Sequence, residues 1–209
     1  MHKWFGAPGA LSLAALVLVA VPRPAAAQND DDLRAERTRG NPAAPVTIYE
    51  ISDFQCPYCG EFWRQTLPAI EREYVAAGKV KIVFVNMPLP IHPNAEPAAE
   101  LAMCAARQHK FWPMHDLLFR HQNQWADLQD PAPYFLSLGD SVRANRAELE
   151  GCLSAKATRA LVQSDFEGAV RSGATSTPTF YIEGGLLVGS QPIEVFRSAL
   201  DSIVRAKAK

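Results

Sequence analysis

The feature that most constrains the fold of this chain is the motif Cys56-Pro57-Tyr58-Cys59, which closely follows a strand-like run. That run, Val46 to Ser52 (VTIYEIS), is rich in β-branched and aromatic residues, which is typical of a buried strand. After the motif, apolar residues recur at three- and four-residue steps, which predicts a helix that Pro68 kinks and Gly78 ends. Val80 to Asn86 (VKIVFVN) is a second strand-like run. This order predicts a right-handed βαβ unit with a parallel strand pair.

The second half of the chain changes from helix to strand. A proline-rich connection over 88–97 precedes a region of helical periodicity, and we expect helices at Ala98–Gln108, Phe111–Gln122, Tyr134–Leu138, Ala147–Leu153 and Ala157–Gly173. Strand character returns at Thr179–Ile182 and Leu186–Val188, which Gly184-Gly185 joins as a hairpin turn, and an amphipathic helix follows at Ile193–Val204. The pattern predicts an α/β fold whose βαβ and ββα parts flank an inserted all-helical block.

The N-terminus has the composition of a secretory signal peptide. Lys3 precedes an apolar run, Ala10 to Val21, that is shorter than the roughly 20 residues needed to span a bilayer. Small residues at Ala25-Ala26-Ala27 predict cleavage after Ala27, so we expect an exported, soluble mature chain; the alternative is an uncleaved anchor helix. Gln28 to Pro45 is polar and is interpreted as a flexible leader or a frayed helix. The net charge of −1 argues against a nucleic-acid partner.

The position of the motif predicts that its two cysteines form a redox-active dithiol or disulfide. Cys56 lies where a strand ends and a helix begins, so its sulfur faces unpaired backbone N–H groups and the positive end of the helix dipole, which lowers a thiol pKa. Pro57 fits the first helical turn, and Cys59, one turn on, is expected to be more buried. A structural disulfide or a metal knuckle is the alternative. Zinc sites normally need a second ligand pair, and the sequence offers none nearby, so we expect no metal and no cofactor.

Three features together resemble the DsbA family of bacterial envelope oxidoreductases. They are Asp53 to Cys59 after a strand, the inserted helical block, and Thr175 to Phe180 (TSTPTF) before a hairpin. The resemblance covers about Pro45 to Val204 and implies a thioredoxin fold with an inserted helical domain. The predicted division is a signal peptide (1–27), a flexible leader (28–45), a βαβ part (46–90), the helical insertion (91–173) and a ββα part (174–209).

The resemblance also assigns residues that contact the substrate. Pro178 matches the family's cis-proline, which faces the active-site disulfide; the alternative is an ordinary trans proline. Thr177 precedes it, where the backbone is expected to pair with a substrate peptide; the alternative is a mere strand-entry residue. Pro57 and Tyr58 lie closest to the reactive sulfur and are predicted to contact substrate as well.

Glu50 matches a buried acid of the family, placed to exchange protons with Cys59. A carboxyl group within VTIYEIS is costly to bury, so its pKa is expected to be raised. The alternative is a Glu50 side chain that points to solvent at the edge of the strand.

Cys104 and Cys152 form the second cysteine pair and fall on separate expected helices of the insertion. We predict a structural disulfide between them, an arrangement that some members of the family resemble; the alternative is two buried free thiols.

The resemblance implies a thiol–disulfide oxidoreductase of the bacterial periplasm. We expect it to oxidise dithiols in unfolded or newly exported proteins and to be reoxidised by a membrane redox partner. One alternative is an envelope isomerase or reductase that is kept reduced, and another is a holdase or metal-binding module that uses Cys56 and Cys59 as ligands.

Overall fold

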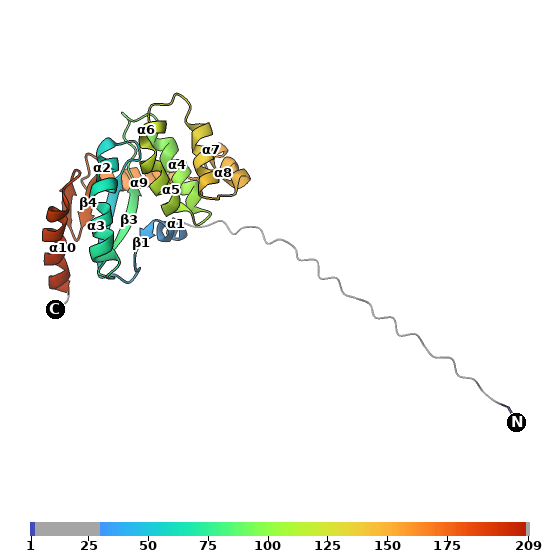
Figure 1. Ribbon diagram of the computed structural model, residues 1–209, viewed down its shortest axis with the longest axis horizontal. Helices are drawn as coiled ribbons and strands as arrows, with labels where there is room; N and C mark the ends of the chain where they lie inside the picture. The colour runs from blue at the N-terminus through green and yellow to red at the C-terminus, as the bar shows by residue number, and fades with distance from the viewer. Residues whose placement is uncertain (3–29, 208–209) are drawn as a thin grey trace.

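A five-stranded sheet lies at the centre of the computed structural model, which describes residues 1–2 and 30–207 (Figure 1). The strand order is β1-β3-β2-β4-β5, formed by β1 (Thr38–Arg39), β2 (Val46–Ser52), β3 (Val80–Asn86), β4 (Thr179–Ile182) and β5 (Gly185–Val188). β2 and β3 are parallel, with Val46 opposite Val80, and the other pairs are antiparallel. The predicted βαβ unit is therefore confirmed, and its first strand, β2, is the central strand of the sheet.

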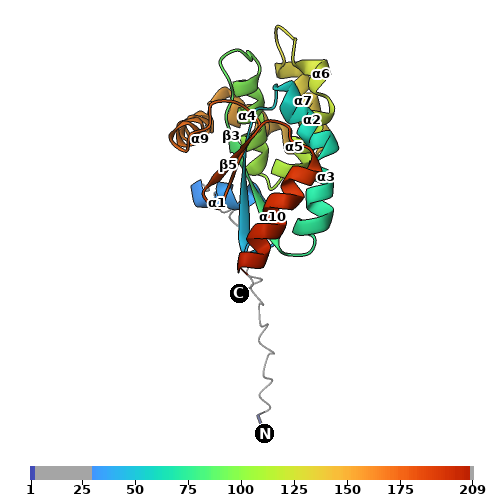
Figure 2. The same cartoon turned by 90° about the vertical axis from the view of Figure 1, so that its left-hand side faces the viewer.

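One face of the sheet is covered by the helices that follow β2 and by the C-terminal helix (Figure 2). These are α2 (Pro57–Gln65), α3 (Leu67–Ile70), the π-helical segment η1 (Glu71–Val75) and α10 (Ile193–Lys207). Phe180 of β4 lies 4.5 Å from the ring of Phe62 on α2 and 4.9 Å from that of Phe196 on α10, measured between ring centroids. The predicted kink lies at Thr66, so that Pro68 falls in the first turn of α3, where its missing N–H costs nothing.

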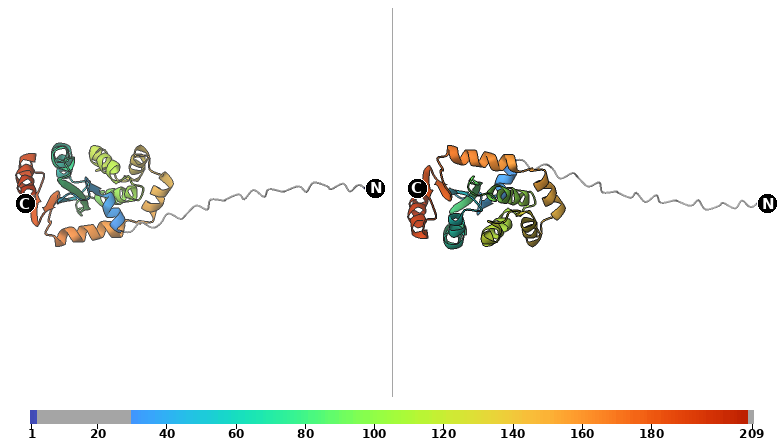
Figure 3. Two further views of the ribbon diagram at one scale, coloured as in Figure 1. Left: turned by 90° about the horizontal axis from the view of Figure 1, so that it is seen from below. Right: turned by 90° about the horizontal axis from the view of Figure 1, so that it is seen from above.

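The region between β3 and β4 is helical, as predicted. It contains α4 (Ala95–Ala106), α5 (Phe111–Arg120), α6 (Gln122–Trp125), α7 (Ala132–Ser141), α8 (Arg146–Ser154) and α9 (Arg159–Arg171). The alanine-rich α4 is buried on nearly all sides and forms the centre of the block. Figure 3 shows α9 (orange) on the opposite side of the sheet from α2 and α3 (teal). Because every strand of the described sheet lies outside 91–173, we propose these residues as the inserted domain.

The structure corrects two local predictions. Of the two interpretations of Gln28 to Pro45, a flexible leader is wrong for 30–39 and a helix is correct for α1 (Asp30–Glu36), which buries Leu33 and is followed by β1, paired antiparallel with β3. The hairpin turn is made by Glu183 and Gly184, which both have positive φ, and not by Gly184-Gly185, because Gly185 already belongs to β5.

Arg37 explains why the leader is ordered. Its side chain is buried, donates a hydrogen bond to the carbonyl oxygen of Phe84 on β3 (3.3 Å) and forms an ion pair with Asp165 on α9. A buried guanidinium without these partners would be costly, so α1 and β1 are held to the sheet by a specific polar contact. The predicted signal peptide, apart from residues 1–2, lies outside the described residues. Among the residues that are described, no helix is long and apolar enough to cross a membrane.

Candidate active site

Cys56 caps the N-terminus of α2. Its backbone is extended (φ −66°, ψ 123°), and Pro57 occupies the first helical turn, where proline is favoured. The backbone N–H of Cys56 donates to the carbonyl oxygen of Asp53 (3.1 Å), which closes the turn between β2 and α2. Backbone N–H groups of Tyr58 and Cys59 donate to the Cys56 sulfur. The strand-to-helix turn thus presents this sulfur to the positive end of a helix, as the sequence predicts.

The surroundings push the pKa values of the two thiols apart. A hydrogen bond from the Cys59 side chain is the largest influence that lowers the pKa of Cys56, to about 6, and the backbone N–H groups add to it against the opposing effect of burial. Burial raises the pKa of Cys59 well above its usual value, and the adjacent Cys56 raises it further. Both cysteines are free in this structure. At neutral pH Cys56 is therefore a thiolate and Cys59 a thiol.

The loop before β4 lies against this sulfur. The Thr177–Pro178 peptide bond is cis, and the Thr177 carbonyl oxygen lies 3.4 Å from Cys56 Sγ. The backbone N–H of Gly189, just after β5, donates to the Pro178 carbonyl oxygen (2.7 Å), which ties the loop to the hairpin. The sequence predicted this proximity only through the family resemblance, because the two segments are 121 residues apart.

Glu50 lies on β2, in the core of the protein and six residues before Cys56. It is fully buried, so the alternative of a solvent-facing side chain at the strand edge is wrong. The residues opposite it are Phe84 on β3 and Phe180 on β4, and neither carboxyl oxygen has a hydrogen-bond partner within the described part of the chain. Burial raises the pKa of Glu50 to about 8, although the positive charge of Arg39 opposes the shift. An acid with this pKa can exchange protons near neutral pH.

Two polar residues to which the sequence assigned no role hold the active-site turn against the helical insertion. The side-chain amide of Gln122 on α6 donates to the carbonyl oxygens of Phe54 (2.7 Å) and Cys56 (2.9 Å). Gln55 donates to the carbonyl oxygen of Ala126 (2.7 Å). Gln122 has no periodic or motif signal, and Gln55 lies within the Asp53 to Cys59 run without an assigned role, so only the fold reveals this contact.

A third such residue is Asp53, which is buried. One of its carboxylate oxygens accepts a hydrogen bond from the backbone N–H of Gln55 (2.7 Å), and the other accepts one from the backbone N–H of Leu89 (2.9 Å). The second oxygen also lies 2.6 Å from His92 Nδ1. A buried carboxylate needs several partners, so an aspartate at the end of a buried strand was the available sequence signal.

The surface around Cys56 is apolar in places. Tyr58 is 63% exposed and Ile91 is 78% exposed, and Leu128 is exposed as well. A groove beside Pro57 is lined by Ile91 and Leu128 together with polar side chains, among them His92. This surface can contact an extended apolar segment next to the sulfur. Within the described residues, no cluster of three or more His, Cys, Asp and Glu side chains could hold a metal ion.

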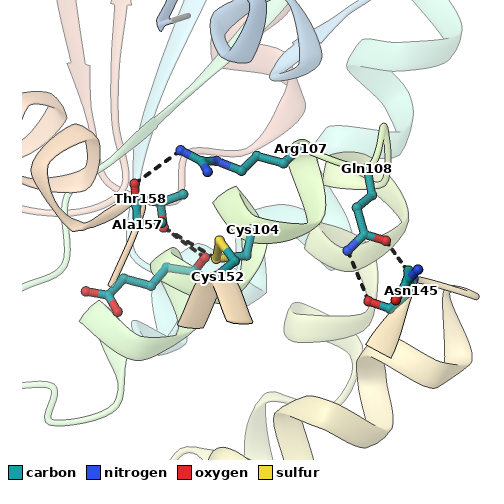
Figure 4. The surroundings of a disulfide bond; sticks show 8 residues. Cys104, Arg107, Gln108, Asn145, Cys152, Ala157 and Thr158 are labelled. Carbon is teal, nitrogen blue, oxygen red and sulfur yellow. Dashed lines mark hydrogen bonds between the residues drawn. A yellow bond between two sulfur atoms is a disulfide. The ribbon is translucent and has the colours of Figure 1, made fainter. Parts of the chain in front are cut away.

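The second cysteine pair lies in the helical insertion, where Cys104 on α4 and Cys152 on α8 form a disulfide (Figure 4). Nearby, the Thr158 hydroxyl donates to the carbonyl oxygen of Glu100 (3.2 Å). The bridge joins two helices of the insertion and is separate from the Cys56–Cys59 pair.

The strand order and the cysteine pair at the turn between β2 and α2 together define a protein of the thioredoxin fold. Residues 32–202 match the family described as Thioredoxin, so the chain belongs to the thioredoxin family. The chain is similar to α-DsbA1 of Wolbachia pipientis, with a TM-score of 0.73 at 20% identity over 82% of this chain and 92% of that one. The predicted resemblance to DsbA proteins and the predicted fold class are confirmed.

Two curated relatives extend the comparison. The chain is 25% identical over 155 residues to a probable disulfide bond formation protein D of Bacillus cereus, covering 72% of this chain and 71% of that protein. It is 36% identical over 170 residues to a Na(+)/H(+) antiporter NhaA 1 of Salinispora arenicola, covering 80% of this chain. The chain spans about a quarter (24%) of the length of that antiporter.

Proposed function

We propose that this chain oxidises dithiols in unfolded or newly exported proteins through the Cys56–Cys59 pair. The observation that carries the proposal is the difference between the two thiols: the pKa of Cys56 is lowered to about 6, and that of Cys59 is raised. A stable Cys56 thiolate favours the reduced form of the pair, and a protein whose reduced form is stabilised is an oxidant towards its substrates.

The reaction starts from the Cys56–Cys59 disulfide. A substrate thiolate attacks the Cys56 sulfur, forms a mixed disulfide and expels Cys59, which takes up a proton. A second substrate thiolate attacks the substrate sulfur of the mixed disulfide and expels Cys56 as a thiolate. The substrate loses two electrons and gains a disulfide, and the enzyme gains both electrons. A leaving thiol of low pKa departs faster, which suits Cys56 to the second step.

Other residues support this chemistry. Glu50 is proposed to exchange the proton of Cys59, because it is buried on the central strand and its pKa is raised to about 8. The backbone of Thr177 is proposed to pair with a substrate strand beside Pro178, next to the reactive sulfur. Tyr58 and Pro57 are proposed to contact the substrate, and the high exposure of Tyr58 supports this role.

The proposed compartment is the bacterial periplasm, with a membrane redox partner that reoxidises the enzyme. The predicted signal peptide supports export, and the Thioredoxin match and the DsbA-like fold support an envelope role. Oxidising surroundings are also where a structural disulfide such as Cys104–Cys152 persists.

The test is equilibration of the mature protein with glutathione buffers, followed by quantification of the reduced Cys56 thiol. Thioredoxin has a potential near −270 mV, and each pKa unit below its nucleophile's value of about 7 is worth roughly 30 mV. We therefore expect a potential above about −250 mV, together with oxidation of a reduced, unfolded substrate. A potential at or below that of thioredoxin would reject the oxidase role, and activity only on scrambled disulfides would support the isomerase alternative.

A further inference from the structure

Three buried oxygens on one face of β2 have no hydrogen-bond partner in the described part of the chain. They are the two carboxyl oxygens of Glu50 and the Oγ of Ser52, and both residues are almost completely inaccessible. Leaving a buried polar group unpaired costs about 1–3 kcal/mol, and native structures contain few such groups. Two unpaired side chains, Glu50 and Ser52, on alternate residues of the central strand therefore need an explanation.

The geometry places Ser52 between Glu50 and the cysteine pair. Side chains two residues apart on a strand point to the same face. Ser52 is the last residue of β2 and lies two residues closer to α2 than Glu50 does. Its hydroxyl is close enough to interact with the carboxyl group of Glu50 and also with the sulfur of Cys59. Among the described residues, Ser52 is the side chain that acts on both Glu50 and Cys59, the two ends of the proton transfer described above.

We propose that Ser52 carries the proton between Glu50 and Cys59, so that the two exchange it through the serine hydroxyl. When a substrate thiolate expels Cys59, the Ser52 hydroxyl gives its proton to the Cys59 sulfur and takes one from the Glu50 carboxylic acid. An S–H bond forms at Cys59, the serine ends with the hydroxyl it began with, and Glu50 becomes a carboxylate. Reoxidation of the pair runs the same transfer in reverse.

The surroundings favour an internal carrier. Glu50 and Cys59 are both fully buried, so bulk water does not reach either group in this conformation. The charged groups that act on Glu50 from the neighbouring elements are Arg39 on β1, Glu71 on η1 and Asp116 on α5. None of them contacts Cys59, whereas a serine hydroxyl can donate one hydrogen bond and accept two, which a relay requires.

The inference rests on the proposed exchange at Cys56 and Cys59, but it does not depend on the direction of electron flow in the cell. The test is therefore the rate at which dithiothreitol reduces the disulfide form in a single turnover, measured by stopped flow at pH values from 5 to 9. Three variants are compared with the unaltered protein: Ser52→Ala, Ser52→Thr and Glu50→Gln, together with the double variant Ser52→Ala/Glu50→Gln.

General acid–base groups typically contribute 10²–10⁴-fold, and water can partly replace a lost relay, so we expect Ser52→Ala to slow the reaction about 10-fold at pH 7. The plot of rate against pH should show an inflection at the pKa of Glu50, and both Glu50→Gln and Ser52→Ala should remove that inflection. Ser52→Thr, which keeps a hydroxyl, should keep both the rate and the inflection. The double variant should be no slower than the slower single variant, because both changes interrupt one path.

Multiplied effects in the double variant, or a Ser52→Ala profile that keeps the Glu50 inflection, would overturn the relay. Ser172→Ala is the matched control, because it removes a hydroxyl that is bonded to Ala169 on the opposite side of the sheet. A redox potential that rejects the oxidase role would not affect how the rates of reduction by dithiothreitol are interpreted. Failure of the proposed function and failure of the relay can therefore be told apart. A loss of stability alone would lower the melting temperature of Ser52→Ala without changing its pH profile, and that result also counts against the relay.

Discussion

The two cysteine pairs of this chain lie in regions that differ in geometry and in chemistry. Cys56 and Cys59 are free, lie on the first turn of α2 and have strongly different pKa values. Cys104 and Cys152 are 48 positions apart and bridge two helices of the insertion. Backbone N–H groups and the paired thiol stabilise a thiolate in the first pair, whereas the second pair closes a long loop. The same residue type therefore has two roles: the pair at the helix N-terminus is proposed to exchange disulfides with a substrate, and the other pair links two helices covalently.

The largest expected effect is the loss of activity on replacing Cys56, and its absence would contradict the different roles given to the two cysteine pairs. Cys56→Ser should reduce dithiol oxidation to the uncatalysed rate, because the exchange needs a sulfur at this position. The double variant Cys104→Ser/Cys152→Ser is the control and should keep its activity within about twofold while it remains folded. Oxidation of a dithiol peptide, measured below the unfolding temperature, compares the two. Residual turnover in Cys56→Ser would show that the pairs had been assigned the wrong roles.

The second prediction measures the bracing role. Removing the Cys104–Cys152 bridge should lower the free energy of unfolding by about 4 kcal/mol, because a loop of 48 residues is no longer closed in the unfolded chain. Urea unfolding of Cys104→Ser/Cys152→Ser against the unaltered protein gives the difference. Both are kept with Cys56–Cys59 oxidised, so that only one bridge changes. A loss below about 1 kcal/mol would mean that the bridge contributes little to stability.

The third prediction concerns the buried acid below the first pair. The pKa of Glu50 rises from 4.5 when exposed to about 8 in the fold, so its favourable contribution is complete below pH 4.5 and is lost as the pH rises through 8. Unfolding free energy should therefore fall by about 3 kcal/mol between pH 5 and 8. Glu50→Gln should flatten this slope.

Urea unfolding of the disulfide form measures the slope without interference from thiol titration. Glu167→Gln, at an exposed position of α9, is the control and should leave the slope unchanged. An equally steep slope in Glu50→Gln would assign the pH dependence to another group.

The smallest expected effect distinguishes the influence of the Tyr58 backbone on the pKa of Cys56 from that of the Tyr58 side chain. Tyr58 lowers the pKa of Cys56 through its backbone N–H, and its side chain is largely exposed. Tyr58→Ala should therefore shift the Cys56 pKa by less than about 0.5 units, which is within ordinary variation among protein thiols. Thiolate absorbance against pH measures it. A larger shift would give the phenol ring a direct part in stabilising the thiolate.

The central elements of the fold could be predicted from sequence because their signals are local. The runs VTIYEIS and VKIVFVN carry β-branched residues in strands buried on both faces, and β2 and β3 occupy the predicted residues. The Cys56 environment was also predictable, since a helix N-terminus supplies N–H groups wherever it occurs. Local periodicity likewise located the insertion, although the helix ends differ by a few residues.

Other parts could not be predicted, because distant partners determine them. Arg37 looks like an ordinary surface arginine until Asp165 meets it, and without that contact a polar leader is expected to be flexible. Gln122 carries no signal of its contact with the active-site turn. Ser52 gains its meaning only from its position between two buried groups, which alternation along a strand suggests but does not identify.

The contact between Cys56 and Thr177 has a consequence for the order in which the chain matures. A polypeptide is made from its N-terminus, so Cys56 exists for the synthesis time of 121 further residues before the opposing carbonyl is available. In that interval β2 also lacks β4, its antiparallel neighbour. Until then the Cys56 sulfur lacks its contact with the Thr177 carbonyl, and the complete site forms only when nearly the whole chain has been made.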